Sequence, residues 1–286
     1  MNQKNNFDLR ISIKNVTKSF KVQDGEVVAL DQISLEIKAG EFICFVGPSG
    51  CGKTTLLNMI AGLEFPSKGE IFQNGKVISA PGIDRVVIFQ EAALFPWLSV
   101  IQNVEFGLVG KMETKKRREI ARTFLNLVHL SKFENSYVHQ LSGGMKSRVA
   151  IARALALNPS ILLMDEPFAA LDAQTRDILH EEIQEIWSHT KQTVIFVTHN
   201  VREAVRLGDR VLIFTARPGR IKKEFSINLP RPRDINSEGV YLYANKIQQE
   251  LREEIEKVLK TEVDHEWTLK KADLLRPAGI DLGSGI

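Results

Sequence analysis

The segment Gly47-Pro-Ser-Gly-Cys-Gly-Lys-Thr54 fits the pattern G-x-x-x-x-G-K-[ST] of a phosphate-binding loop. An apolar run typical of a buried strand, Phe42 to Val46, precedes it, and a helical pattern from Thr54 to Ala61 follows it. The glycines allow backbone N–H groups to turn inward around phosphate oxygens, and a helix N-terminus adds the positive end of its dipole. The sequence therefore predicts an α/β fold with a nucleotide phosphate site after this strand.

Two side chains at the end of the loop have the chemistry that such a site needs. Lys53 supplies a mobile cation for the terminal phosphates, and the Thr54 hydroxyl is a ligand for Mg²⁺. We interpret Cys51, within the loop, as a small residue that leaves the backbone free rather than as a reactive thiol. An ordinary glycine-rich turn is the alternative, and the strand and helix patterns on either side argue against it.

A pair of acidic residues follows a second apolar run, in Ile161-Leu-Leu-Met-Asp-Glu-Pro167. Open α/β sheets bind ligands beyond the carboxyl ends of their strands, so Asp165 is expected beside the phosphate-binding loop. There its carboxylate would hold Mg²⁺ directly or through water. Glu166 would face the space beyond the terminal phosphate and orient or deprotonate a water molecule. By themselves, these two residues would also fit a solvated acid pair at a strand end.

The pattern of apolar residues predicts the other elements. Ile11 to Val16 and Ile33 to Lys38 alternate as half-exposed antiparallel strands do. Short, continuous apolar runs indicate central strands of a parallel sheet flanked by helices. These runs are 42–46, 86–89, 161–164 and 194–197, and a further strand-like run is 211–214. A helical pattern fills most of 91–157, and a second one carries Ala244, Ile247, Leu251, Ile255 and Val258.

The composition is that of a globular protein and excludes several classes. The chain has 286 residues, of which 43% are hydrophobic and 26% are charged, with a formal net charge of +3. This balance argues against a nucleic-acid coat, an acidic tail and a mainly disordered chain. Cys44 and Cys51 are too few for a disulfide framework. We expect a soluble protein, because Met1 to Arg10 lacks the apolar segment of a secretion signal and no apolar run could cross a bilayer.

Three further motifs make the nucleotide site more specific. Leu141-Ser-Gly-Gly-Met145 precedes a helical pattern, Gln90 follows one apolar run, and His199 follows another. In this order the motifs resemble those of the ATP-binding-cassette (ABC) ATPases, over about residues 9–235. The spacing and order of five motifs carry this resemblance, because each of them alone is short.

The resemblance implies a fold and a domain organisation. The fold is a P-loop NTPase core with an antiparallel β subdomain and an inserted helical subdomain. The ABC ATPase domain would span residues 9–235, with the helical subdomain at about residues 91–157. Residues 236–286 would form a C-terminal helical extension and a loose tail.

The resemblance also implies roles around ATP and Mg²⁺. Gln90 matches a glutamine that contacts metal and water, His199 a histidine that hydrogen-bonds the γ-phosphate, and Phe20 an aromatic residue that stacks on adenine. Phe20 alone would equally fit a core residue. In the family, Ser142-Gly-Gly144 faces the ATP held by a second copy of the domain, and Asp172 matches an acid that reaches across the dimer.

Together with the assignments made from the residues themselves, this gives a complete set of expected site residues. The expected catalytic residues are Glu166, His199, Lys53 and Gln90, and the expected metal ligands are Thr54, Gln90 and Asp165. The expected nucleotide-binding residues are Phe20, Gly47, Pro48, Ser49, Gly50, Cys51, Gly52, Lys53, Thr54, Thr55, Ser142, Gly143, Gly144 and Asp172.

Among the branches of this family, a transporter ATPase is the best match. The segment between Gly52 and Ser142 is too short for the coiled coils of DNA-repair relatives, and translation-associated relatives usually carry two cassettes where this chain has one. The basic run Lys115 to Arg118 is expected to be a solvated helix face. The alternatives are a soluble ABC-type ATPase that switches a DNA- or ribosome-bound complex, and a P-loop kinase, in which Ser142-Gly-Gly144 would have no role.

Short patches resemble the nitrate/sulfonate/taurine/bicarbonate importer ATPases of bacteria. They are Leu94-Phe-Pro-Trp-Leu98, Ala216 to Arg220 and Leu229 to Asp234. Trp97 would contact a cytoplasmic helix of the membrane subunit, or else pack between subdomains. The subfamily implies an ATPase at the cytoplasmic face of the cell membrane. Its expected partners are integral membrane permease subunits, an identical or paralogous second ATPase, and a periplasmic or lipoprotein substrate-binding protein. No nucleic acid is expected to bind. The ATPase does not touch the cargo, so no residue identifies it.

Overall fold

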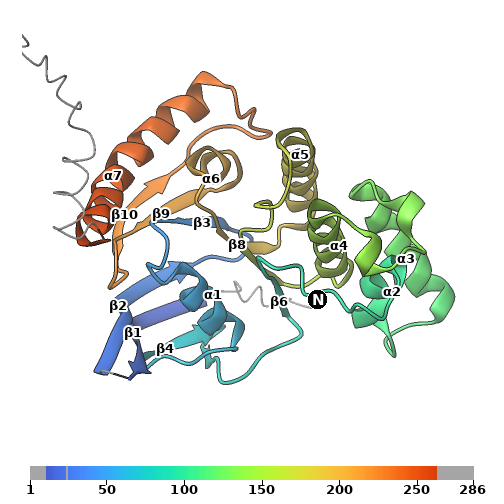
Figure 1. Cartoon of the computed structure of the whole chain (residues 1–286), viewed down its shortest axis with the longest axis horizontal. Helices are drawn as coiled ribbons and strands as arrows, with labels where there is room; N and C mark the ends of the chain where they lie inside the picture. The colour runs from blue at the N-terminus through green and yellow to red at the C-terminus, as the bar shows by residue number, and fades with distance from the viewer. Residues whose placement is uncertain (1–10, 24, 263–286) are drawn as a thin grey trace, which may run out of the picture.

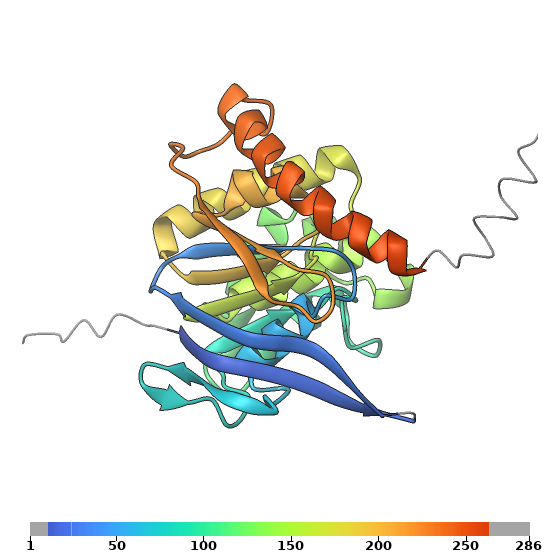
Figure 2. The ribbon, with the colours of Figure 1, turned by 90° about the vertical axis from the view of Figure 1, so that its left-hand side faces the viewer.

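The computed structural model describes residues 11–23 and 25–262, which form two β-sheets and their covering helices. The smaller sheet is antiparallel with the order β2-β1-β4-β5, and the larger has the order β10-β9-β3-β8-β7-β6. Figures 1 and 2 show the smaller sheet beneath the larger one. The strands are β1 (Ile11–Val22), β2 (Gly25–Ile37), β3 (Phe42–Val46), β4 (Lys68–Gln73), β5 (Lys76–Val77), β6 (Arg85–Ile88), β7 (Ile161–Asp165), β8 (Thr193–Val197), β9 (Arg210–Phe214) and β10 (Ile221–Ser226).

Helices cover the larger sheet, and one helix lies between the two sheets. The α-helices are α1 (Lys53–Ala61), α2 (Val100–Glu105), α3 (Thr114–Leu127), α4 (Gly143–Ala156), α5 (Ala173–Thr190), α6 (Val201–Leu207) and α7 (Glu238–Glu262). Three short 3₁₀ helices are η1 (Phe106–Leu108), η2 (Ser131–Phe133) and η3 (Val138–Gln140). None of the helices in the described ranges combines the length and the hydropathy of a bilayer-spanning segment.

The continuous apolar run of β3 is explained by two cores, one on each face of the larger sheet. Phe42, Cys44 and Val46 pack into the core beneath helices α4 to α7. Ile43 and Phe45 pack into the core that α1 and the smaller sheet share. Because successive side chains of a strand alternate between faces, a strand covered on both faces has to be apolar throughout. β3 pairs in parallel with β8 and β9, as the sequence predicts for a central strand.

The predicted half-exposed strands form the smaller sheet. β1 pairs antiparallel with β2, with Ile11 opposite Ile37 and Ile13 opposite Leu35. Those four side chains are buried, whereas Lys14 and Glu36 point away from the core and are exposed. The alternation seen in the sequence is therefore the difference between the covered and the open face of this sheet.

One expectation about the larger sheet is wrong. The run 86–89 is not a central strand, because among the described strands β6 pairs only with β7 and forms the edge of the sheet. Val86 and Val87 are half-buried, and Phe89 lies beyond the strand with 41% of its surface exposed. A four-residue apolar run cannot show how many neighbouring strands it will have, since that depends on the topology.

The predicted helical segment lies to one side of the sheets (Figure 1). α2, α3 and α4 pack on one another through Val104, Leu125 and Val149, which are fully buried. The basic run at the start of α3 is only partly the solvated face that the sequence predicts. Arg117 and Arg118 form ion pairs with the buried carboxylate of Glu105, at 3.3 and 3.6 Å.

The C-terminal helix α7 covers the chain's own core along its first half. Val240, Ala244, Ile247 and Leu251 are buried there. The apolar stripe of α7 continues beyond these four residues, but Ile255, the next apolar residue of the stripe, is 42% exposed. The predicted loose tail lies outside the described residues.

Candidate nucleotide site

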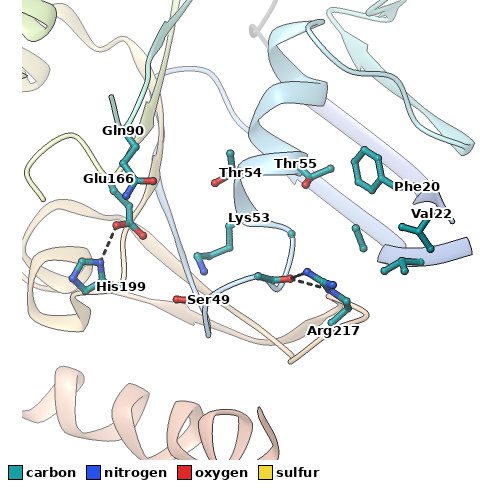
Figure 3. Close-up of a pocket in the computed structure, with 14 residues that line it drawn as sticks. Phe20, Val22, Ser49, Lys53, Thr54, Thr55, Gln90, Glu166, His199 and Arg217 are labelled. Carbon is teal, nitrogen blue, oxygen red and sulfur yellow. Dashed lines mark hydrogen bonds and ion pairs between the residues drawn. The ribbon is translucent and has the colours of Figure 1, made fainter. Parts of the chain in front are cut away.

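A cavity of about 540 Å³ lies where the two sheets meet at the carboxyl end of β3 (Figure 3). β1 and β2 form one wall, the phosphate-binding loop and the start of α1 form the floor, and the segments after β6, β7 and β8 form the opposite wall. The lining residues are Phe20, Val22, Val27, Ala29, Ser49, Gly50, Gly52, Lys53, Thr54, Thr55, Gln90, Glu166, His199 and Arg217. Half of the predicted nucleotide-binding residues, seven of fourteen, thus line one cavity.

Two glycines give the phosphate-binding loop its shape. Gly50 and Gly52 have φ angles of 71° and 97°, in the left-handed region that side chains disfavour. A Cβ at Gly52 would also lie 2.7 Å from Leu30 Cδ2. These glycines let the loop close over the start of α1 with Ser49 and Gly50 exposed.

The cation of the loop is Lys53. It is 6% exposed, and its Nζ donates hydrogen bonds of 2.9 Å to the carbonyl oxygens of Gly47 and Pro48. Gly47, Pro48 and Cys51 do not line the cavity, although they are part of the motif. Burial raises the pKa of the Cys51 thiol, which agrees with its interpretation as an unreactive small residue.

Two oxygen ligands suitable for Mg²⁺ lie side by side at the start of α1. Thr54 Oγ1 donates a 3.1 Å hydrogen bond to Asp165 Oδ1, which stands at the carboxyl end of β7. Desolvation raises the pKa of Asp165, although the Thr54 hydrogen bond and the Lys53 charge act in the opposite direction. A bound cation would relieve this cost. Mg²⁺ takes few protein ligands together with phosphate and water oxygens, so this pair fits it.

Glu166 and His199 lie next to each other on one wall of the cavity, at 3.0 Å between Oε2 and Nδ1 (Figure 3). Glu166 follows β7 with a positive φ of 46°, and its backbone N–H donates to the Val197 carbonyl. His199 follows β8, and its side chain is 69% exposed. Gln90, after β6, lines the same wall. Three strand ends therefore bring together residues that lie far apart in the sequence.

Phe20 lies on the opposite wall with Val22 (Figure 3). It is 40% exposed, so it is not the core residue that the sequence left as an alternative. The ammonium group of Lys18 lies 4.8 Å from the centre of the Phe20 ring. An exposed ring face at the edge of a phosphate site is a surface on which a base can stack.

The remaining predicted residues lie outside this cavity. Ser142 caps α4, because its Oγ accepts a hydrogen bond from the Met145 N–H, and Gly143 beside it is exposed. Asp172 caps α5, and the hydrogen bond from the Thr175 N–H lowers the pKa of its carboxyl. Ser142, Gly143, Gly144 and Asp172 are absent from the lining of the cavity. One chain therefore presents an incomplete set of the residues predicted to surround ATP.

Known proteins resemble this chain in sequence and in structure. A family model described as ABC transporter matches residues 30–169. An uncharacterized ABC transporter ATP-binding protein of Methanocaldococcus jannaschii is 53% identical over 253 residues, which cover 88% of this chain and 95% of that protein. The nitrate import ATP-binding protein NrtD of Synechocystis is 45% identical over 82% of this chain and 88% of its own length. The aliphatic sulfonates import ATP-binding protein SsuB of Bacillus cereus is 44% identical over 85% and 96%.

A solved structure agrees with the architecture. It is the dimeric structure of a post-hydrolysis state of an ATP-binding cassette bound to ADP and Pi, with a TM-score of 0.71 and 35% identity. The match covers 77% of this chain and all of that one. The chain belongs to the ABC transporter ATPase family. The ATP-binding proteins of this family hydrolyse ATP, and the fold is the ABC form of the P-loop NTPase fold.

The ABC ATPase exposes a group of aromatic side chains on its helical segment. Trp97 is 70% exposed, so it does not pack between subdomains as one of the two expectations had it. Its ring lies 5.5 Å from that of Phe95, which in turn lies 4.4 Å from the ring of Phe106. Phe106 is 49% exposed. We call Phe95, Trp97 and Phe106 the aromatic patch.

Sequence reasoning missed four of the residues that line the cavity of the ABC ATPase, Val22, Val27, Ala29 and Arg217. Among these four, only Arg217 has a charged side chain. It lies in the turn between β9 and β10, and its Nε and Nη2 each donate a 3.2 Å hydrogen bond to the Gly50 carbonyl. In the sequence, the segment Ala216 to Arg220 stands out only for its resemblance to importer ATPases. No spacing in the sequence links it to the phosphate-binding loop.

Proposed function

We propose that this chain is the ATP-hydrolysing subunit of an importer for a small anion, of the nitrate or sulfonate type. The observation that carries the proposal is the cavity in which the phosphate-binding loop meets Gln90, Glu166 and His199. The cargo class is supported by NrtD and SsuB, which are named for nitrate and aliphatic sulfonates. The reaction is the hydrolysis of ATP to ADP and phosphate.

In this proposal the cavity binds ATP with the base on Phe20 and the phosphates over residues 49–55. Lys53 stabilises charge on the terminal phosphates, and backbone N–H groups of the loop surround them. Thr54, Asp165 and Gln90 would hold Mg²⁺, which neutralises phosphate charge when bound. Within the described ranges, no group of three or more His, Cys, Asp or Glu side chains is arranged so that it could hold a metal ion, and Mg²⁺ in such a site does not need one.

Glu166 and His199 then share the chemistry at the terminal phosphate. Glu166 Oε2 positions a water molecule for attack and accepts its proton. His199 lies 3.0 Å from that carboxylate and would donate a hydrogen bond to the γ-phosphate. The positive φ of Glu166 is a conformation that side chains disfavour, and it is found where a functional group has to be aimed.

The site would be completed by a second copy of the domain, identical or paralogous. Ser142 and Gly143 are exposed at the N-terminus of α4, where the hydroxyl, the backbone N–H groups and the helix dipole all favour an anion. Asp172 is exposed at the start of α5. These residues would close over the ATP of the partner subunit, so that ATP holds the dimer together until hydrolysis.

The membrane partners would be permease subunits that contact the aromatic patch. Exposed aromatic side chains beside a polar rim are typical anchors of protein interfaces. The subunit would lie at the cytoplasmic face of the membrane, and a substrate-binding protein would join the complex through the permease. In this proposal the ATPase domain spans residues 9–235, with the helical subdomain at about residues 91–157 within it, and residues 236–286 form the C-terminal extension.

The second candidate is an ABC-type ATPase that switches a DNA- or ribosome-bound complex. The ion pairs at the start of α3 weigh against it, because Glu105 neutralises charge on Arg117 and Arg118. A basic run that is paired within the protein has less charge to offer to a phosphate backbone.

The test is the Glu166→Gln variant, compared with Glu119→Gln, which changes an exposed residue of α3. Because the amide cannot accept the proton, we expect hydrolysis to fall at least about hundredfold. ATP should still bind and should hold E166Q as a dimer in light scattering, whereas E119Q should behave as the wild type. Used as bait, the trapped dimer should recover a multi-span permease. Hydrolysis within a few-fold of the wild-type rate would remove Glu166 from its role, and recovery of nucleic acid would favour the second candidate.

A further inference from the structure

The turn between β9 and β10 places a cation on the phosphate-binding loop. Arg217 holds the Gly50 carbonyl with a fork of two hydrogen bonds, each 3.2 Å long. Its guanidinium is exposed and lines the cavity. In Figure 3, Arg217 lies on the same side of the loop as Phe20 and Val22, away from Glu166 and His199. Its charge therefore lies toward Phe20, on which a base could stack, and away from Glu166.

The backbone of this turn is wedged between the loop and the smaller sheet. The Gly219 N–H donates to the Ala29 carbonyl at 2.9 Å, and the Gly219 carbonyl accepts from the Asp31 N–H at 3.0 Å. A Cβ at Gly219 would lie 1.9 Å from the Cys51 carbonyl oxygen, so only glycine allows so close an approach. Arg220 closes the turn with an ion pair to Asp31. The turn is thus held in place on two sides by backbone contacts.

The C-terminal helix α7 contacts the turn between β9 and β10 on a third side. Glu254 of α7 is 1% exposed, and its Oε2 accepts a 3.0 Å hydrogen bond from the Ala216 N–H, next to Arg217. Its Oε1 lies 2.6 Å from Lys257 Nζ and 3.4 Å from Lys222 Nζ. A buried carboxylate persists only with such partners. A continuous chain of contacts therefore leads from α7 through Ala216 and Arg217 to the loop at Gly50.

We propose that Arg217 is a nucleotide-binding residue, whose guanidinium binds phosphate oxygens of a nucleoside di- or triphosphate, and that Glu254 is a positioning residue for it. Within the described ranges, Nη1 of Arg217 has no hydrogen-bond partner, so the fork on Gly50 leaves an N–H group for the ligand. Arginine suits this double role because its planar group donates in several directions at once. The inference rests on the proposed function, because it needs ATP in this cavity, and it gives the C-terminal helix a role in binding.

The test measures the Kd of a fluorescent ADP analogue and of the corresponding ATP analogue, each with Mg²⁺, on the full-length protein. We expect R217Q to raise both Kd values about tenfold, since it removes a charge-assisted contact that does not depend on the terminal phosphate. E254Q should raise them about threefold, and the R217Q/E254Q double variant should match R217Q alone, because one residue acts through the other. R217K keeps the charge without the fork and should lie between R217Q and the wild type.

Two controls separate binding from folding. R122Q removes an exposed cation of α3 that pairs with Glu134, and E256Q removes an exposed acid of α7 that pairs with Arg252. Both should bind as the wild type does. The slope of log Kd against the logarithm of the salt concentration should decrease in R217Q, which loses the charge, and stay unchanged in R217K, which keeps it. If the arginine had only a structural role, the slope would not depend on its charge.

The outcomes are distinguishable. A wild-type protein that binds neither analogue would overturn the proposed function. Normal wild-type binding with an unchanged Kd and salt slope in R217Q would overturn the role of Arg217 alone. Effects of R217Q and E254Q that multiply in the double variant would overturn the positioning role of Glu254 and leave that of Arg217.

Discussion

Asp165 shows how a single residue can be costly for stability and yet suited to its proposed task. Its carboxyl is 5% exposed at the end of a fully buried strand, and desolvation raises its pKa. A raised pKa in the folded state means that stability is lost as the pH rises through the unfolded and then the folded value. At neutral pH the charged form is therefore a burden that a bound cation would relieve.

The prediction at this scale concerns Asp165→Asn. Asparagine keeps the shape and accepts the Thr54 hydrogen bond, but it carries no charge. We expect the nucleotide-free variant to gain about 1 kcal/mol in the free energy of unfolding, as substitutions of strained functional residues often do. Urea denaturation at pH 7 measures this gain, and ATP hydrolysis should fall at least about hundredfold. Asp234→Asn, at an exposed position, is the control. If D165N is less stable than the wild type, the prediction is wrong, and neighbouring groups stabilise the Asp165 charge without a metal ion.

At the scale of elements, α7 is a structural part of the cassette as much as an extension of it. Its first half contributes four buried apolar side chains to the core, and Glu254 bonds the turn before β10. Sequence periodicity predicts one apolar face along the helix, from Ala244 to Val258. In the structure only the first part of this face packs on the core, because the core ends before Ile255. The helix therefore contains a packed half and an open half.

We predict that two alanine substitutions on this helix differ strongly. Ile247 is fully buried, so Ile247→Ala should cost about 2–5 kcal/mol through lost packing and a cavity. Ile255→Ala removes the same atoms from an exposed position and should cost less than about 1 kcal/mol. Thermal or urea unfolding of both variants gives the comparison. Equal losses would mean that the open half of α7 is covered in solution.

On the scale of the whole molecule, ion pairs connect segments that are distant in sequence. Arg210 bonds Glu41 before β3 at 2.8 Å and Glu224 of β10 at 2.7 Å. Its hydrogen bond lowers the pKa of Glu224 below the ordinary 4.5. The hydrogen bond from Lys18 likewise lowers the pKa of Glu64. Carboxyls with lowered pKa values stabilise the fold above their unfolded pKa, and this stabilisation is lost as the pH falls through the folded value.

The free energy of unfolding should therefore decrease once the pH falls below about 4.5, with each exposed pair contributing at most about 1 kcal/mol. Urea denaturation between pH 7 and pH 3.5 tests this. Arg210→Gln should be less stable than the wild type at pH 7, and the difference should shrink toward acid pH as the carboxyls are protonated. A difference that does not change with pH would assign the contribution of Arg210 to packing.

Much of the site follows from short segments read one after another. The phosphate-binding loop, the acids after β7 and the residues after β6 and β8 each stand at a strand end, and parallel strands bring their carboxyl ends to one edge. For that reason Lys53, Thr54, Asp165 and Glu166 could be expected together, and the resemblance to ABC ATPases adds Gln90 and His199. The local pattern suffices where geometry is set within a few residues of a strand or a helix end.

Other features depended on the tertiary structure, because they are contacts between segments that no local pattern relates. The position of β6 at the sheet edge, the pairing of Arg117 with Glu105, and the contact of Arg217 with Gly50 are of this kind. The last joins residues 167 positions apart. Sequence by itself therefore determined the family and predicted the residues of the phosphate site. Only the folded chain decided which distant side chains support that site, since such contacts depend on how the sheets and helices pack.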